Sequence, residues 1–242
     1  MTKITLFILF TLPAWLSVQA QGYFFGIIQD KDGYVNVRND QKAVIDKLTE
    51  NHVFFDWNTN NDPKAEWHGI TYGAETGITR ENPHGTNTTT GNIHKSRICY
   101  LDDLPRLKCK LSDDNRTLFA NDTVSVEIRT RKFRPEKHRI QRYEGGMPIR
   151  SIDGVEDIWG TECQMPQTEY ASIAVKYPGG VLEFPREYLD HLYEPSNYLL
   201  VSIGKDNTLF IQSLNGDGAG GYLTVWTIQN YQIKNQLVLS GF

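Results

Sequence analysis

The chain is poor in cysteine and histidine, the side chains that most often hold transition-metal ions. It contains three cysteines and six histidines among 242 residues. No two histidines stand four residues apart, and no two cysteines have the spacing of a zinc site. The sequence therefore gives no sign of a metal centre, and we expect no cofactor.

A recognisable set of catalytic residues is also missing. A papain-like peptidase needs a cysteine at the start of a helix and a histidine from a later strand. Cys163 is followed three residues later by a proline, which would block a helix, and the only histidine after it is His191. The chain has no Gly-x-Ser-x-Gly motif, and acids such as Glu169, Glu183 and Asp190 are too common to indicate a glycosidase. We therefore predict that the protein is not an enzyme.

The chain has no surplus of positive charge. Its 25 Lys and Arg residues stand against 29 Asp and Glu residues, which gives a formal net charge of −4. Nucleic-acid-binding proteins normally carry a basic surplus, so we expect no nucleic-acid partner.

A long hydrophobic run is absent beyond the first 20 residues, and those 20 residues have the layout of a secretory signal. Lys3 precedes an apolar run from Ile4 to Leu16, and the small or apolar residues Val18 and Ala20 stand where a signal peptidase reads. This run is too short to span a bilayer, which needs roughly 20 residues. Gln21 follows the expected cut, so a lipid anchor is not indicated. We expect a periplasmic or secreted protein with no membrane span after cleavage.

Three cysteines in an oxidising compartment allow at most one disulfide within the monomer. Cys99 and Cys109 flank a short polar turn and could meet across it. The sequence leaves this pairing open, because it does not fix the distance that disulfide geometry demands.

Residues 21–100 have the pattern of a small β-barrel. Tyr34 to Arg38 alternates between apolar and polar side chains, as a half-buried strand does. Further short apolar segments follow at Ala43–Leu48, His52–Trp57 and Glu66–Ile70, separated by polar turns. Short strands at such regular intervals are typical of a small barrel.

This region resembles a bacterial SH3-like domain. The resemblance rests mainly on an opening block, Gly33–Arg38, and a closing block, Gly91–Ile98, and it covers about a third of the chain. It implies an exported module that binds cell-wall peptides or accompanies cell-wall enzymes. Two departures from the family pattern are Asn39–Lys42, in place of the usual Ser-Gly-Pro turn, and the long polar insertion from Tyr72 to Thr90. The insertion could cover the ligand groove.

The resemblance also favours a bacterial source. Asn-x-Thr triplets at Asn87, Asn115 and Asn121 would be glycosylation acceptors in a eukaryotic secretory route, but they carry no such meaning in a typical bacterium.

Aromatic residues are dense in the first half, and four of them are candidate ligand-binding residues: Tyr34, Trp57, Trp67 and Tyr72. The alternative is that these aromatics fill the barrel interior. We expect Trp67 to lie in the core and Trp57 and Tyr34 to lie at the surface, in a groove bordered by the insertion.

The second half predicts a separate antiparallel domain. Residues 101–121 are polar and are expected to be a linker. Within residues 122–242, Pro178–Gly180 marks a hairpin, and Pro185 should begin a short helix over Arg186–Tyr193. Four more strands are expected at Tyr198–Ile203, Thr208–Leu214, Tyr222–Ile228 and Ile233–Leu239. The Gly-rich loop Asn215–Gly221 lies between two strands, which favours a wide hairpin with glycines at positive φ over a phosphate or calcium loop.

A basic run between Arg129 and Arg142 contains seven Lys or Arg residues. Such a run could dock an anionic partner, or it could be a solvated hairpin. The candidate residues for an anionic partner are Arg129, Arg131, Lys132, Arg134, Lys137 and Arg139.

The sequence as a whole predicts a mostly β protein with a signal peptide at 1–20, an SH3-like barrel and an antiparallel β-rich domain with one short helix. The expected function is non-enzymatic binding of a cell-wall peptide or an envelope protein. Two alternatives stay open. One is an inhibitor or immunity-type protein that caps an extracytoplasmic toxin or cell-wall hydrolase, and the other is an unrecognised cell-wall hydrolase.

Overall fold

The computed structural model describes residues 25–58, 62–73, 88–146, 148–162, 164–196, 198–216 and 218–241. The expected signal peptide, most of the Tyr72–Thr90 insertion and Cys163 lie outside the described residues. The described chain is mostly β, with four antiparallel sheets and 3-10 turns but no α-helix of seven or more residues. No helix among these residues has both the length and the apolar character needed to cross a membrane.

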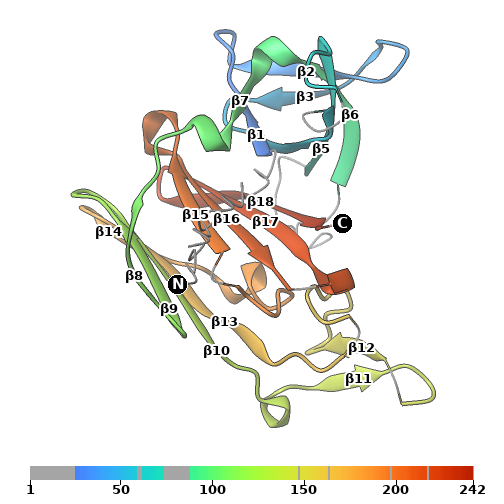
Figure 1. Ribbon diagram of the computed structural model, residues 1–242, viewed down its shortest axis with the longest axis vertical. Helices are drawn as coiled ribbons and strands as arrows, with labels where there is room; N and C mark the ends of the chain where they lie inside the picture. Colours follow the sequence, from blue (N-terminus) through green and yellow to red (C-terminus); the bar gives the residue numbers. More distant parts are fainter. Residues whose placement is uncertain are drawn as a thin grey trace, which may run out of the picture.

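The first sheet is a seven-stranded half-barrel formed by the N-terminal part of the chain (Figure 1). Its strand order is β3-β2-β6-β5-β4-β1-β7. The strands are β1 (Phe25–Ile28), β2 (Tyr34–Arg38), β3 (Val44–Thr49), β4 (Val53–Asp56), β5 (Trp67–Gly73), β6 (Thr88–His94) and β7 (Ile98–Tyr100), with 3-10 turns η1 (Lys95–Arg97) and η2 (Leu101–Asp103). Alternation in β2 buries Val35 and Val37 and leaves Tyr34 outside, as expected from the sequence.

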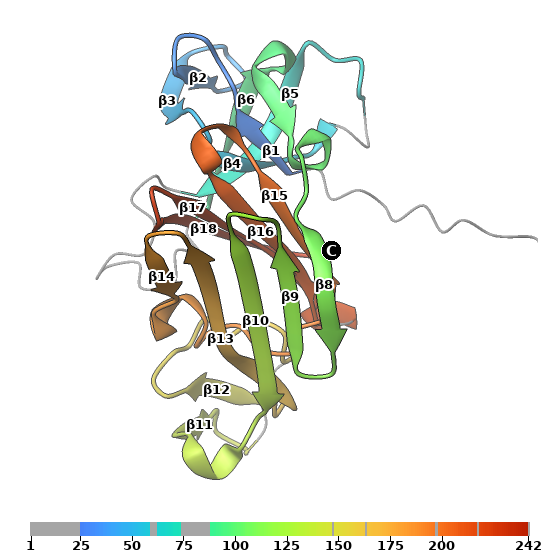
Figure 2. The same cartoon turned by 90° about the vertical axis from the view of Figure 1, so that its left-hand side faces the viewer.

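The second sheet has five strands in the order β14-β13-β10-β9-β8, and it faces the viewer in Figure 2. Its strands are β8 (Lys108–Asp113), β9 (Arg116–Ala120), β10 (Ser125–Lys132), β13 (Thr168–Tyr177) and β14 (Gly180–Glu183). The 3-10 turn η3 (Pro135–Lys137) and a two-stranded sheet, β11 (Ile140–Arg142) and β12 (Ile149–Ile152), are inserted between β10 and β13.

The expected linker at 101–121 is therefore wrong. It contains β8 and β9, and β9 pairs with β10 from Ser125–Ala120 to Arg129–Arg116. Phe119 is buried in the core beneath this sheet, and Leu101 is buried as well. Polar residues on the outer face of the hairpin gave the segment its linker-like composition, since every residue of β8 is exposed.

The third large sheet, β15-β16-β17-β18, is the middle layer of the molecule (Figures 1 and 2). Its strands are β15 (Tyr198–Ile203), β16 (Leu209–Asn215), β17 (Tyr222–Gln229) and β18 (Gln232–Ser240), with 3-10 turns η5 (Lys205–Asn207) and η6 (Gly218–Gly220). Consecutive residues enter opposite cores. Val225 packs with Phe25 on the half-barrel side, and its neighbour Trp226 packs with Tyr170 on the side of the five-stranded sheet. The middle sheet is thus covered on both faces.

The expected helix at Arg186–Tyr193 is only a short 3-10 turn, η4 (Arg186–Tyr188). The backbone beyond it is used elsewhere. Trp159 N–H donates to His191 O at 2.9 Å, and Tyr193 N–H donates to Trp159 O at 3.1 Å. Leu192 forms a β-bridge with Trp159 and Tyr193 forms one with Glu169, so the backbone does not continue as a helix beyond Asp190.

The hairpin at Asn215–Gly221 is confirmed, because it joins β16 to β17 and has positive φ at Gly216 and Gly218. The considered disulfide is not formed: Cys99 and Cys109 are both free thiols. Cys99 lies in β7 of the half-barrel and Cys109 in β8 of the five-stranded sheet, so the two side chains belong to different layers.

Candidate functional site

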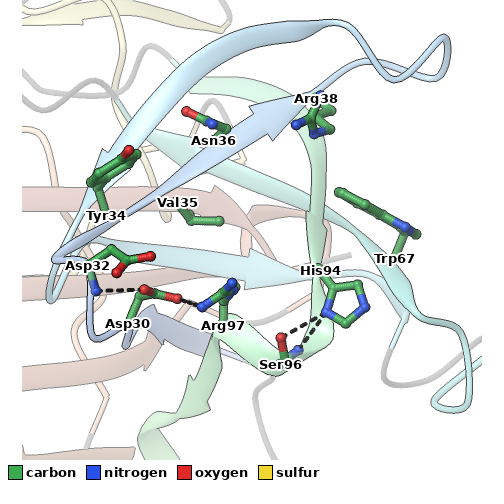
Figure 3. Close-up of a pocket in the computed structure, with 10 residues that line it drawn as sticks. All are labelled: Asp30, Asp32, Tyr34, Val35, Asn36, Arg38, Trp67, His94, Ser96 and Arg97. Atoms are coloured by element: carbon green, nitrogen blue, oxygen red, sulfur yellow. Dashed lines mark hydrogen bonds and ion pairs between the residues drawn. The ribbon is translucent and has the colours of Figure 1, made fainter.

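A pocket of about 440 Å³ opens where two strands of the half-barrel separate (Figure 3). β2 pairs with β3 along its whole length, from Tyr34 to Arg38, but it pairs with β6 only at Arg38–Asn92. Beyond that point the edge of β2 faces η1 across the pocket. We call this site the half-barrel pocket; its lining residues are Asp30, Asp32, Tyr34, Val35, Asn36, Arg38, Trp67, His94, Ser96 and Arg97.

Two aromatic side chains stand at opposite ends of the half-barrel pocket (Figure 3). Tyr34 is 39 % exposed and Trp67 is 37 % exposed. The ammonium of Lys47 lies 3.6 Å from the centre of the Tyr34 ring, and the Arg38 guanidinium lies 6.0 Å from the centre of the Trp67 ring. The His94 ring meets Trp67 edge-on at 5.5 Å. Each aromatic is therefore held in place by neighbours and still presents surface to the pocket.

Charge in the half-barrel pocket is distributed unevenly along its length. Asp30 and Arg97 form an ion pair in its floor, and the backbone N–H of Asp32 donates to Asp30 Oδ1 at 2.8 Å. The Asp32 carboxylate, beside Tyr34, makes no ion pair within the described part of the chain. At the Trp67 end, Arg38 uses one nitrogen to donate to Lys42 O at 2.7 Å and keeps its other donors. The pocket thus offers a carboxylate at one end and a guanidinium at the other.

Asp30 should make the stability of the protein sensitive to acid. Its pKa is lowered by the hydrogen bond from the Asp32 N–H and by the Arg97 charge, against the opposing effect of burial. The Asp30 carboxylate therefore stabilises the folded protein fully above its unfolded-state pKa of about 3.9. This contribution to the free energy of unfolding is lost as the pH falls through the lower folded-state pKa. We expect the free energy of unfolding, measured by urea titration from neutral pH downwards, to fall less steeply in Asp30→Asn than in the parent protein. The same acid dependence in both proteins would contradict this assignment.

The four aromatic residues predicted to bind ligand do not share one groove. Tyr34 and Trp67 line the half-barrel pocket. Trp57 is exposed, as expected, but it lines a separate hollow with Ile45 and Thr90. Tyr72 is 1 % exposed, its hydroxyl donates to Asp46 at 3.0 Å, and burial raises its pKa above the usual range. Tyr72 is therefore a core residue and lines neither of these two hollows.

The prediction that Trp67 lies in the core is also wrong, because the alternation in β5 places its neighbour His68 inside. His68 Nδ1 lies 2.7 Å from Asp56 Oδ2, and the Tyr100 hydroxyl donates to the same oxygen at 2.6 Å. His68 Nε2 lies 3.2 Å from Ala65 O. Both ring nitrogens are thus engaged, and this buried network links β4, β5 and β7.

Most of the polar residues of the half-barrel pocket were not predicted from the sequence: Asp32, Asn36, Arg38, His94, Ser96 and Arg97. The signal that could have found them was present. The blocks Gly33–Arg38 and Gly91–Ile98, which carry the resemblance, supply Asn36, Arg38, His94, Ser96 and Arg97.

The basic run divides into neutralised and free cations. Arg129 is neutralised by Glu127 at 2.7 Å, a contact that lowers the pKa of that glutamate. Arg139 contacts Asp153 only through its backbone N–H, a bond that does not neutralise its guanidinium. A separate hollow, which we call the basic hollow, is lined by Arg131, Lys132, Arg134, Lys137 and Glu169.

Arg131 pairs with Glu169 at 2.8 Å in the wall of the basic hollow. In the described part of the chain, Lys132, Arg134 and Lys137 form no ion pair, so three cations are available there to an anionic group.

Within the described residues, no group of three or more His, Cys, Asp or Glu side chains is placed so that it could hold a metal ion. Comparisons of the chain with protein-family models, with curated proteins and with solved structures found no match. What the protein binds must therefore be inferred from the chemistry of its own side chains.

Proposed function

We propose that this chain is a non-enzymatic binding protein of the bacterial envelope, and that its half-barrel recognises a cell-wall peptide or a protein segment. The observation that carries this proposal is the separation of β2 from β6. It leaves one edge of β2 facing a pocket with an aromatic side chain at each end.

An extended peptide suits this arrangement because it can add to a strand edge through main-chain hydrogen bonds. Alternate side chains of such a peptide would point towards Tyr34 and Trp67. Asp32 would accept hydrogen bonds from an ammonium group, and Arg38 would donate to a carboxylate. Cell-wall peptides carry both kinds of group, and so does a short segment of a protein.

The envelope location is supported by the sequence of residues 1–20, which has the order of a secretory signal. The SH3-like character of the half-barrel is supported by the two blocks that line the half-barrel pocket. The envelope location, the SH3-like character and the absence of catalysis are all parts of this proposal.

The test is co-sedimentation of the mature full-length protein with purified peptidoglycan sacculi. Trp67→Ala is expected to weaken binding by about 30-fold, because a buried interface tryptophan contributes about 2 kcal/mol. Asp32→Asn should weaken binding less than Trp67→Ala does, since it removes one exposed charge. The loss of affinity should be largest at low salt, where that charge is least screened. The matched control is Trp57→Ala, an exposed tryptophan of the same half-barrel that lies in a different hollow.

Equal retention of Trp67→Ala and Trp57→Ala on sacculi would overturn the pocket assignment. If the parent protein does not sediment with sacculi at all, the proposal that it binds the cell wall is wrong. A tight stoichiometric complex with an envelope hydrolase, without affinity for sacculi, would instead establish the inhibitor alternative.

A further inference from the structure

A second pocket lies in the other half of the molecule, at one end of the sandwich made by the middle sheet and the five-stranded sheet. Figure 2 shows the β9–β10, β13–β14, β15–β16 and β17–β18 turns at the same end of these two sheets. All four turns contribute to a pocket of about 400 Å³, which we call the turn pocket. It shares no lining residue with the half-barrel pocket. Turns held at one end of a rigid sandwich are a common place for a binding site.

The turn pocket has an apolar floor and a polar rim. Its floor is the end of the core between the two sheets and includes Val175, Leu209 and Ile228. Its rim carries Asp206 and Asn207 from the β15–β16 turn and Asn230 from the β17–β18 turn. No hydrogen bond or ion pair of these three side chains is found within the described residues. An apolar floor with a few convergent polar groups is the usual composition of a small-molecule site.

Two stacked tyrosines form one wall of the turn pocket. The rings of Tyr177 and Tyr231 are 3.7 Å apart between centroids and 17° from parallel. Tyr177 ends β13 in one sheet, and Tyr231 lies in the β17–β18 turn of the other. Tyr231 is 51 % exposed, so one part of its ring contacts Tyr177 and another part remains open.

Tyr231 occupies a backbone conformation that does not suit a tyrosine. Asn230 has φ 51° and Tyr231 has φ 60°, as in the two-residue turn that normally prefers Asn-Gly. Asp206 and Asn207 of the neighbouring turn also have positive φ. Asn and Asp tolerate this region, but a bulky aromatic residue there is a genuine outlier. Strained residues of this kind cluster at ligand clamps.

The charge of the turn pocket narrows the choice of ligand. No Lys, Arg or His lines it, all its lining residues being described, and its only charged side chain is that of Asp206. The nearby Lys205 extends its ammonium to Glu50, at 3.3 Å, in the half-barrel. An anionic ligand would therefore meet a carboxylate and no countercharge, and nothing here offers the paired acids that a polycation would need.

We propose that the turn pocket binds a neutral saccharide. The C–H face of a pyranose ring would stack on the open part of Tyr231, since an aromatic ring offers a large rigid apolar surface at little cost in conformational entropy. The hydroxyls of the same ring would bind Asp206, Asn207 and Asn230, whose side chains can both accept and, for the two asparagines, donate hydrogen bonds. The strain at Tyr231 is retained because a glycine, which would relieve it, has no ring to form the stacking platform.

The test uses isothermal titration calorimetry of the mature full-length protein with three neutral probes: tetra-N-acetylchitotetraose, cellotetraose and maltotetraose. We expect at least one probe to bind. Tyr231→Gly should weaken that binding tenfold or more, and its melting temperature should be unchanged or higher because glycine suits the positive φ. Asp206→Asn should also weaken binding while keeping a residue that tolerates the turn conformation. The matched control is Tyr143→Gly, an exposed tyrosine outside the turn pocket, which should leave saccharide binding unchanged.

A weaker saccharide affinity together with an undiminished melting temperature in Tyr231→Gly would show that the Tyr231 ring binds ligand and does not merely stabilise the fold by stacking on Tyr177. A stack that only closes the sandwich would give the opposite result, with a lower melting temperature in Tyr231→Gly and the same saccharide affinity. That result would overturn the proposal, as would the absence of binding for all three probes. Binding of sacculi through the half-barrel pocket is measured separately with Trp67→Ala, so the failure of either proposal leaves the other to be judged by its own variants.

Discussion

Replacing Trp226 with alanine is expected to lower the free energy of unfolding by about 3–5 kcal/mol, the usual cost of deleting a large buried aromatic side chain. Trp226 lies in the middle of β17, between Ile211 of β16 and Gln236 of β18, and it is 0 % exposed. Its indole meets Tyr170 edge-on at 5.8 Å and Phe184 at 6.0 Å. Truncation would leave a large cavity in the core between the middle sheet and the five-stranded sheet. Urea denaturation monitored by circular dichroism measures the loss.

Trp226→Phe is the informative companion. No hydrogen-bond partner for the indole Nε1 is found in the described part of the chain. Phenylalanine keeps most of the edge-to-face contact and removes this buried N–H, so its cost should be much smaller than that of alanine. If Trp226→Ala cost no more than Trp226→Phe, the packing described for this core would be wrong.

Gly160→Ala is expected to destabilise the protein by about 2–5 kcal/mol. Gly160 has φ +89°, where a Cβ alone costs about 1–2 kcal/mol. A Cβ at this position would also lie 2.4 Å from Tyr193 O, the backbone oxygen that accepts a hydrogen bond from the buried Tyr222 hydroxyl at 2.9 Å. Moving that oxygen weakens a buried hydrogen bond, which adds about 1–3 kcal/mol.

The control for this substitution is Gly33→Ala. Gly33 has a similar φ of +76°, but no atom lies within 4 Å of its Cβ position. It therefore isolates the backbone term, and its cost should be about 1–2 kcal/mol. A similar loss of stability in both variants, measured by thermal unfolding, would show that the contact with Tyr193 is relieved by a small backbone shift.

The strands of the middle sheet were predictable from the sequence. The expected strand Tyr198–Ile203 has the same bounds as β15, and the expected strands Tyr222–Ile228 and Ile233–Leu239 fall within β17 and β18. Their signal was strong because they are apolar and are separated by Gly- and Asn-containing turns. The predicted hairpin at Pro178–Gly180 is confirmed by the pairing of β13 with β14. It too was predictable because two apolar segments flank a turn rich in Pro and Gly.

Features that depend on pairing between distant segments were not predictable. Composition alone made β8 and β9 resemble a linker, since their strand character comes from hydrogen bonds to β10. Similarly, whether the Trp67 side chain faces the core or the surface depended on the register of β5, which could be shifted by one residue. His68 occupies the inward position because Asp56 and Tyr100 are present to satisfy it, and neither is near His68 in sequence.

The candidate sites were partly predictable. Tyr34 and Trp67 were expected to bind ligand from their residue type, and both line the half-barrel pocket. The charged residues around them were missed because their convergence depends on the separation of β2 from β6. The turn pocket gave no local signal at all, since its residues come from four turns that meet only after the two sheets have packed.

The order of the layers also constrains how the chain acquires its structure. β15 to β18 come last along the chain, yet they form the middle layer, so both outer layers rest on segments that leave the ribosome after them. Phe25 and Leu237, at opposite ends of the described chain, share one core. Such long-range closure is entropically costly and slows folding. Until the last strands arrive, the inner faces of the half-barrel and of the five-stranded sheet stay exposed to water. Apolar surface exposed in this way is prone to aggregation, so the C-terminal strands protect both outer layers once they are in place.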